Sequence, residues 1–324
     1  MLGDPVTAGR AVSEGSYRPE EAVRSRQRAA AVSTMNAPDL AVRAGRLALK
    51  RANRPAREIG LLIHANCFDQ GVHFWNAAAY IQQGVLGHGD ALAFEIRQMS
   101  NGGMCSVEVA AAQLTAMPEL SAALLTTGDR FAEPRFPRWS ADQGLVFGDA
   151  GTAMILCRDR GLLRLVATAT HSEPRLEGLH RGEDLHAPPA PDEPIDLQAR
   201  KKAFMAGMPL AEVIALNAAG MLTAVRRCLA NAANTMEHMT AVVVPFFGAD
   251  LVDKQCLGPL GLDPGKTLLE YGLDTGHLGA GDQFAGLSRL LETGRLARGE
   301  RVLLVGVGAG FSWTCAVLEV SADG

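Results

Sequence analysis

The sequence has few charged and few aromatic residues for its length. Of its 324 residues, 20% are charged and 5% are aromatic, whereas 48% are hydrophobic. It has no long block of Lys and Arg, and the net charge of −4 argues against a nucleic-acid partner. The apolar runs are strand-sized and interrupted by glycine, and residues 1–30 carry charges throughout without a hydrophobic signal region. We therefore expect a globular, cytoplasmic protein that does not span a membrane.

The cysteines and histidines do not form metal-ligand motifs. The six cysteines occur singly in apolar segments, at Cys67, Cys105, Cys157, Cys228, Cys256 and Cys315. This pattern is typical of small buried side chains rather than of disulfides or a zinc site. The spacing of His171, His180 and His186 also fits no compact ligand set. We expect no metal and no bound cofactor. We also expect residues 158–200 to form a solvent-exposed segment between the two halves of the chain.

The most informative stretch is 94–107, which reads Phe-Glu-Ile-Arg-Gln-Met-Ser-Asn-Gly-Gly-Met-Cys-Ser-Val. An apolar run predicts a buried strand at its start, and helical spacing of apolar residues begins at Met104. Gly102 and Gly103 allow a sharp turn and close backbone approach at this junction. Ser100 then lies at the positive end of a helix, either as an acyl-accepting nucleophile or only as the helix cap.

The same order of predicted elements occurs twice: helix, strand, helix, strand, Gly-rich loop, helix, strand, strand. In the first half these include a helix at 39–53 and strands at 60–65, 91–96, 122–128 and 146–157; in the second, a helix at 216–233 and strands at 241–245, 267–271, 301–306 and 314–320. Residues 1–36 lack sustained periodicity and predict a partly mobile arm. Such a repeat indicates a duplicated α/β fold.

The duplication divides the chain into a half of residues 1–158 and a half of residues 159–324. The first half carries Ser100 in its Gly-rich loop, and the second carries His277 and Asp282 in the corresponding loop. If the halves pack about a pseudo-twofold axis, the two loops face each other at the centre. This arrangement would bring a nucleophile, a base and a carboxylate together.

Four segments together resemble the thiolase superfamily and, within it, the ketoacyl-ACP synthase III branch. They are Phe94-Glu-Ile-Arg-Gln-Met-Ser, Phe147-Gly-Asp-Ala-Gly-Thr-Ala, Gly276-His-Leu-Gly-Ala and Gly308-Ala-Gly-Phe-Ser-Trp. The resemblance covers roughly residues 36 to 320 by order of elements. It implies a five-layered α-β-α-β-α thiolase fold made of two similar halves, and usually a homodimer.

Several positions depart from the pattern of that branch. Ser100 stands where the branch has its nucleophilic cysteine, and Cys105 does not match that position. The histidine of the branch motif Pro-His-Gln-Ala-Asn is replaced by Phe246 or Phe247, and the asparagine of Gly-Asn-Thr-Ser is replaced by His277. The first strand and the tryptophan and arginine that bind coenzyme A in the branch have no clear counterpart.

These departures resemble a subgroup from antibiotic and polyketide pathways that carries a Ser or Cys, a His and an Asp. The daunorubicin priming protein is an example. A serine, unlike a cysteine, needs an adjacent general base, which His277 would supply, and Asp282 would orient His277. The resemblance thus implies an acyltransferase in which Ser100 takes an acyl group from a coenzyme A or carrier-protein thioester. The acyl group then passes to a hydroxyl, an amine or a carrier thiol, and the backbone amides of Ser100 and Ala309 form the oxyanion hole.

Other functions are open at this point. In a starter-unit synthase of this type, His277 alone would assist decarboxylation of a malonyl thioester, and a new C–C bond would form. A non-catalytic partner of a polyketide synthase would bind acylated carrier without forming an acyl-Ser100. A hydrolase would use water as the acceptor. Structurally, Ser100 and Asp282 are also reasonable as helix caps and His277 as a loop histidine.

A few further residues are candidates for binding. The substrate pocket is expected to include Phe246 and Phe247. Phe74 and Trp75 resemble the position from which the family projects an aromatic side chain into the acyl pocket of the neighbouring subunit, although core packing explains them equally well.

Several residues outside the expected pocket are candidates for contacts with the carrier or for structural hydrogen bonds. Arg138 and Trp139 are either a contact for a carrier phosphate or adenine, or an exposed loop pair. Asp149 is expected to form hydrogen bonds in a tight turn. Lys201 and Lys202 are either a contact for an acidic carrier protein or solvated surface.

Overall fold

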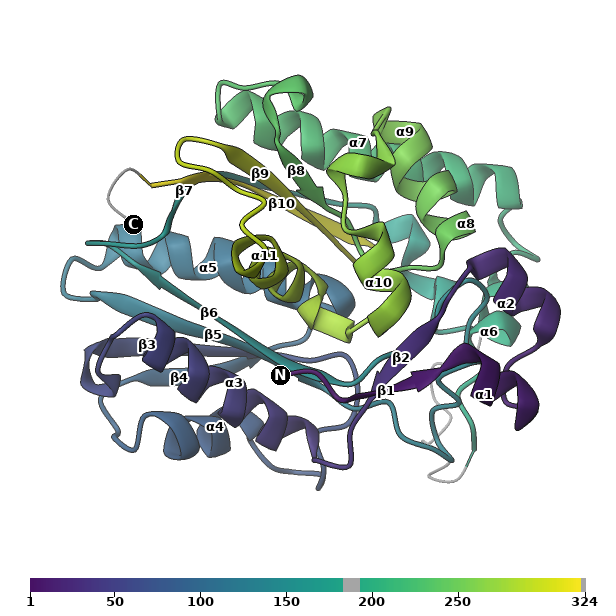
Figure 1. The fold of residues 1–324 in the computed structure, drawn as a ribbon, viewed down its shortest axis with the longest axis horizontal. Helices are drawn as coiled ribbons and strands as arrows, with labels where there is room; N and C mark the ends of the chain where they lie inside the picture. Colours follow the sequence, from purple (N-terminus) through teal and green to yellow (C-terminus); the bar gives the residue numbers. More distant parts are fainter. Residues whose placement is uncertain (183–192, 322–324) are drawn as a thin grey trace.

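The computed structural model describes residues 1–182 and 193–321. Two four-stranded sheets lie face to face, with helices between them and on both outer faces (Figure 1). The strands of the first sheet, in spatial order, are β4 (Leu92–Ile96), β3 (Ile59–Ala65), β5 (Ala122–Asp129) and β6 (Ala150–Cys157). Those of the second are β7 (Leu163–Ser172), β10 (Ser312–Val320), β9 (Arg301–Gly308) and β8 (Ala241–Val243).

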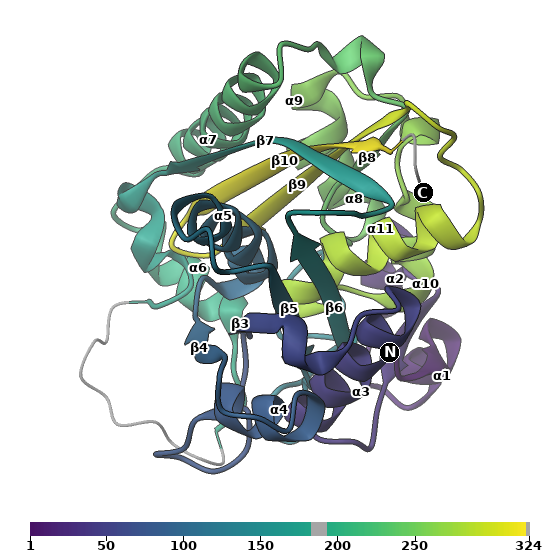
Figure 2. The ribbon, with the colours of Figure 1, turned by 90° about the vertical axis from the view of Figure 1, so that its left-hand side faces the viewer.

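The helices complete five layers, which Figures 1 and 2 show from two sides. The outer helices of the first sheet are α3 (Ala37–Arg51) and α4 (Ala77–Val85), and the central pair is α5 (Gly102–Ala116) and α11 (Asp282–Glu292). The second sheet is covered by α7 (Leu210–Asn231), α8 (Ala249–Val252) and α9 (Gly258–Leu260), and α10 (Leu269–Thr275) leads into α11. The strands β3 and β5 are buried nearly throughout because helices cover both faces of their sheet.

Three adjacent strands of each sheet repeat one pattern. β3 runs parallel to β5, which pairs antiparallel with β6, and β8 runs parallel to β9, which pairs antiparallel with β10. The fourth strand differs, because β4 lies beside β3 whereas β7 lies beside β10. The five-layered α/β fold class is therefore confirmed. The division into halves of residues 1–158 and 159–324 stays a prediction.

Two sequence-based expectations in the second half are wrong. The predicted strand at 267–271 is instead the start of α10, in a segment too short for its apolar residues to distinguish the two periodicities. The expected solvent-exposed segment at 158–200 contains β7, a half-buried edge strand on which His171 stacks against Trp313. His186 lies outside the described residues.

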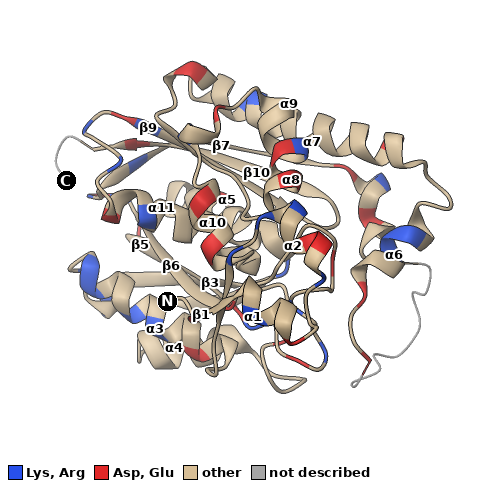
Figure 3. Cartoon of the chain, turned by 45° about the vertical axis from the view of Figure 1, so that its right-hand side comes forward, with Lys and Arg blue, Asp and Glu red and all other residues tan. Residues whose placement is uncertain are grey.

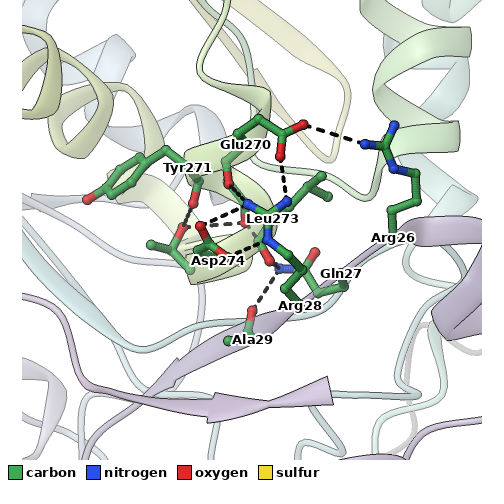
Figure 4. A network of polar contacts seen from close by, with 10 residues as sticks. Arg26, Gln27, Arg28, Ala29, Glu270, Tyr271, Leu273 and Asp274 are labelled. Atoms are coloured by element: carbon green, nitrogen blue, oxygen red, sulfur yellow. Dashed lines mark hydrogen bonds and ion pairs between the residues drawn. The ribbon is translucent and has the colours of Figure 1, made fainter. Parts of the chain in front are cut away.

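The first 36 residues form regular structure instead of a mobile arm. They contain β1 (Asp4–Thr7), α1 (Ala8–Ser13), α2 (Pro19–Ser25) and β2 (Ala29–Val32), and β1 pairs antiparallel with β2. The segment after α2 binds to α10, as Figure 4 shows. The buried amide of Gln27 donates to the carbonyl oxygens of Gly272 and Leu273, at 3.1 and 2.9 Å. Arg28 forms ion pairs with Glu270 and Asp274 on the exposed side.

The helix α7 is apolar and 22 residues long, so that length and composition alone would permit it to cross a membrane. Length and composition are weak evidence for a membrane-spanning helix, because the core helix of a soluble protein meets the same criteria. One face of α7 packs on β7 and β10, and a Cβ atom at Gly220 would lie 2.3 Å from the Trp313 ring. In the view of Figure 3, acidic and basic residues are interspersed over the surface elements rather than gathered in one stripe.

Candidate active site

Ser100 lies in a tight turn between β4 and α5. The turn is a single 3₁₀ segment, Met99–Asn101, and Met99 has a positive φ of 47°, which is uncommon for a residue other than glycine. Gly102 has ordinary helical dihedrals, but a Cβ atom at Gly103 would lie 2.3 Å from the carbonyl oxygen of Ala280. The sharp bend therefore occurs at Met99, whereas Gly103 allows α5 to approach the loop that carries His277.

His277 is fixed by backbone hydrogen bonds to the segment before β6. Its N–H donates to the Val146 carbonyl, and its own carbonyl accepts from the Gly148 N–H, both at 2.8 Å. A Cβ atom at Gly148 would lie 2.2 Å from the Thr275 carbonyl oxygen, so this approach requires glycine. Two of the motifs quoted above, one from each half of the chain, thus pair directly at the site.

Ser100, His277 and Asp282 form one hydrogen-bonded chain. Ser100 Oγ lies 2.7 Å from His277 Nε2, across 177 residues of sequence. His277 Nδ1 lies 2.6 Å from Asp282 Oδ2. Both His277 and Asp282 are buried, at 2% and 1% exposure, whereas Ser100 borders a cavity. The structure thus brings the three predicted residues together in the predicted order.

The contacts of Asp282 determine which nitrogen of His277 carries the proton. Asp282 Oδ1 accepts the Leu278 N–H at 2.7 Å, and Oδ2 accepts the Phe246 N–H at 2.8 Å. An ionised carboxylate in such a site only accepts, so we assign the proton to Nδ1. Nε2 is then unprotonated and faces the hydroxyl of Ser100. A general base for that hydroxyl needs this tautomer.

The alternative in which these side chains are only helix caps finds no support. The N-terminus of α5 has Asn101 as its cap residue, and that of α11 has Gly281, in each case without a side-chain capping bond. The hydroxyl of Ser100 instead contacts His277, and the carboxylate of Asp282 instead binds His277 and backbone amides.

A cavity of about 310 Å³ opens onto Ser100 and His277. Its wall is largely aromatic and aliphatic. The apolar lining consists of Phe68, Met99, Phe131, Phe136, Leu145, Phe147, Ile195, Leu197, Phe247, Val307, Ala309 and Phe311. Such a wall fits an apolar or aromatic group, and polar side chains that include Ser100 and His277 share the same lining.

Of the four predicted pocket residues, the structure places one in the cavity. The Phe247 ring lines it and lies 5.4 Å from the His277 ring. The prediction for Phe246 is wrong, because its side chain is buried at 3% exposure against Tyr271 and it contributes only its N–H, to Asp282. Phe74 and Trp75 are exposed and do not line the cavity of their own chain. Their insertion into a second subunit stays a prediction.

The predicted oxyanion donors border the same cavity. Ala309 lies in the turn between β9 and β10, and Ser100 lies in the turn before α5. Their role stays a prediction.

Sequence analysis did not identify Cys67 as a residue of this site. It follows β3 and lines the cavity, and its Sγ lies 3.7 Å from Ser100 Oγ. Burial and, next, the charge of Asp129 hold the pKa of this thiol well above its usual range. A thiol in this state is a poor nucleophile, since the thiolate is the reactive form.

We expect Cys67 to resist alkylation and not to replace the serine. The thiolate fraction falls about tenfold for each unit by which the pKa rises. Iodoacetamide treatment of the native protein, followed by peptide mass spectrometry, is therefore expected to modify Cys67 more slowly than the partly exposed Cys157. In a Ser100→Ala protein, an acyl group found on Cys67 would contradict this assignment.

Two loop assignments, those of Arg138 and Trp139, need correction. Arg138 is neither a free phosphate contact nor an exposed residue: it is buried and pairs with Asp149 at 2.9 and 3.0 Å. Trp139 is buried too and packs on Tyr17. The expectation for Asp149 is confirmed, since it also accepts the N–H groups of two residues, Ser33 and Phe131. Among the lysines, Lys201 binds the buried carboxylate of Asp142 at 2.6 Å.

The fold and the site define an acyl-transferring or condensing enzyme of the thiolase type. Residues 229–320 match the family model for the C-terminal part of 3-oxoacyl-[acyl-carrier-protein] synthase III. The beta-ketoacyl-[acyl-carrier-protein] synthase III of Nitratidesulfovibrio vulgaris is 29% identical over 299 residues, which cover 91% of this chain and 86% of that protein.

Solved structures give closer matches. ChlB3, an acyltransferase, superposes with a TM-score of 0.93 at 33% identity, covering 99% of this chain and 95% of that one. The 3-oxoacyl-[acyl-carrier-protein] synthase III of Aquifex aeolicus has the same fold, with a TM-score of 0.80 at 18% identity and coverage of 98% and 96%. The chain thus has the ketoacyl-ACP synthase III-like fold of the thiolase superfamily, and its C-terminal part matches the synthase III family model.

Proposed function

We propose that this protein is an acyltransferase of secondary-metabolite biosynthesis that works through an acyl-Ser100 intermediate. The observation that carries the proposal is the chain of hydrogen bonds from Ser100 through His277 to Asp282, at 2.7 and 2.6 Å. A nucleophile, a base and an orienting carboxylate in this order are the parts that acyl transfer needs. The similarity to the acyltransferase ChlB3 supports the same reading.

The first half-reaction loads the enzyme. His277 Nε2 takes the hydroxyl proton as Ser100 Oγ attacks the thioester carbonyl, and amides at Ser100 and Ala309 stabilise the oxyanion. The C–S bond then breaks, and the leaving thiol takes the proton from the imidazolium. Asp282 stabilises that imidazolium without itself becoming protonated. The product is an ester of Ser100.

The second half-reaction reverses these roles. His277 takes the proton of an acceptor hydroxyl, amine or carrier thiol, the acceptor attacks the ester, and Ser100 recovers its proton. Donor and acceptor therefore use one site in turn. Acyl-CoA or an acyl carrier protein is the proposed donor. Two arginines that line the cavity, Arg97 and Arg200, provide positive charge for a phosphate-bearing carrier, whereas Arg135 pairs with Asp69.

Condensation is the second candidate function, and the names of the relatives favour it. Several are beta-ketoacyl-[acyl-carrier-protein] synthases III. Against it, Phe247 adjoins His277 in the cavity wall, and the paired histidine and asparagine of that branch are absent. Release of carbon dioxide from malonyl thioester with a new C–C bond would establish condensation. Ester, amide or thioester exchange would establish transfer.

Intact-protein mass spectrometry tests the acyl intermediate. The native chain is incubated with acetyl-, hexanoyl- and benzoyl-CoA, alongside Ser100→Ala, His277→Ala and Cys105→Ala. We expect a mass gain that is lost in Ser100→Ala, slowed in His277→Ala by about 10³-fold or more, and kept in Cys105→Ala. A mass gain that depends on Cys105 would contradict the assignment of the nucleophile. If the acyl-enzyme releases free acid without an acceptor, the protein is a hydrolase, and if no form is labelled, a non-catalytic binding role is favoured.

A further inference from the structure

A second buried carboxylate lies behind the site and has no part in the mechanism above. Asp129 is the last residue of β5 and is completely buried, at 0% exposure. It is distinct from Asp282, which binds His277 directly. A buried carboxylate without a lysine or arginine partner is costly, so its hydrogen-bond partners indicate what it is for.

All three backbone donors bound by Asp129 come from the two loops that border the site. Its Oδ1 accepts the N–H groups of Cys67 and Phe68, at 2.8 and 2.9 Å. Its Oδ2 accepts the N–H of Ala280, at 3.2 Å. Cys67 and Phe68 line the cavity in the first half of the chain, whereas Ala280 lies between His277 and Asp282 in the second.

The loop in the second half is shaped around this carboxylate. Gly279 has a positive φ of 60°, and a Cβ atom at this position would lie 2.2 Å from Asp129 Oδ2. No side chain fits there without displacing the carboxylate. The Gly279–Gly281 turn also contacts the start of α5, since Gly103 approaches the Ala280 carbonyl.

We propose that Asp129 is a positioning residue for acyl transfer: its carboxylate ties the Cys67–Phe68 turn to the loop that holds His277 and Asp282, and so sets the base against Ser100. The proposal deepens the proposed function and rests on it. Asp129 does not touch the reacting atoms, so it acts through the placement of His277 and through its charge.

The ionisation of Asp129 gives the proposal a measurable signature. The ionisable groups whose charges act on it or respond to it are His277 and Cys67. Burial raises the pKa of Asp129 to about 6, and the three backbone N–H groups and the charge of His277 oppose that rise. Above this pH the carboxylate accepts three hydrogen bonds. Below it, one oxygen becomes a donor that faces N–H groups, so the tie between the two loops is weakened.

The test is the pH dependence of Ser100 acylation in Asp129→Asn, measured by intact mass with the CoA thioester that labels the native protein fastest. Asparagine keeps the shape, but its NH₂ group must face a backbone N–H, and it carries no charge. We expect acylation at pH 8 to slow by about 10- to 100-fold, as for a small misplacement of a reacting group. We also expect the acid limb of the profile to become shallower, because the proton that binds Asp129 in the native protein no longer contributes to it.

A matched control separates positioning from simple stability. Asp142 is another buried aspartate, which binds Lys201 instead of the site, so Asp142→Asn is expected to keep the native acid limb and rate. If Asp129→Asn does not fold, Asp129→Ser is used in its place, because serine keeps a hydrogen-bond acceptor in a smaller side chain. A folded variant with the native rate and the native acid limb would overturn the proposal. So would a slower variant whose acid limb is unchanged. Failure of the native protein to acylate at all would instead refute the proposed function.

Discussion

Asp282→Asn is expected to lower the rate of Ser100 acylation by about 10⁴-fold, which is the size of the effect when the orienting carboxylate of a Ser-His-Asp triad becomes an amide. Asp282 accepts three hydrogen bonds, from His277 Nδ1, the Leu278 N–H and the Phe246 N–H. An asparagine offers one accepting oxygen and one donating nitrogen, so at least one of these donors loses its acceptor. If the amide nitrogen faces Nδ1, the imidazole adopts the opposite tautomer and its proton points at Ser100.

The control for this variant is Asp274→Asn. Asp274 lies on α10, close in sequence to His277, but its carboxylate binds the exposed Arg28 rather than the site. We expect this variant to acylate within about twofold of the native rate, since exposed ion pairs contribute little. Equal rates for the native protein and Asp282→Asn would show that His277 is not the base for Ser100.

The largest loss of stability is expected for Arg138→Leu. This change leaves the buried carboxylate of Asp149 without its cation, and breaking a buried pair from one side typically costs about 3–5 kcal/mol. Two backbone N–H groups, those of Ser33 and Phe131, still bind Asp149 but do not neutralise it. We expect the free energy of unfolding to fall by that amount in urea titrations, with the m-value unchanged.

Arg28→Leu provides the contrast. Arg28 forms two ion pairs in the network of Figure 4, but its side chain is 44% exposed, against 8% for Arg138. Exposed pairs are worth about 0–1 kcal/mol, because water screens them and the side chains lose entropy. A loss for Arg28→Leu as large as that for Arg138→Leu would contradict the view that burial, and not the number of pairs, decides the cost.

The residues of the candidate triad could be predicted because each lies in a short motif with its own local signature. Ser100 precedes two glycines at a strand-to-helix junction, and His277 and Asp282 lie in the corresponding Gly-rich loop. The order of elements then indicated that the two loops meet. Their hydrogen bonds, at 2.7 and 2.6 Å, agree with that expectation.

Residues that join distant parts of the chain could not be predicted in the same way. Asp129 ends a strand in a sequence that resembles many strand ends, and its partners at Cys67 and Ala280 are set only by the packing of the two halves. Phe246 and Phe247 are neighbours of the same type, so that only the structure shows which one faces the cavity. The first 36 residues look irregular because their order comes from binding α10 and not from their own periodicity.

The pairing of β7 with β10 has a consequence for synthesis of the protein. Within the described residues, Leu163–Ser172 pairs with one strand, Ser312–Val320, so β7 has no strand partner until almost half of the chain has been synthesised after it. At about 5–20 residues per second, the ribosome needs roughly 7–30 s for that distance. Throughout this interval β7 is an unpaired edge that can join another chain. We therefore expect the nascent protein to depend on a chaperone at this stage, and overproduction to yield aggregates that begin at β7.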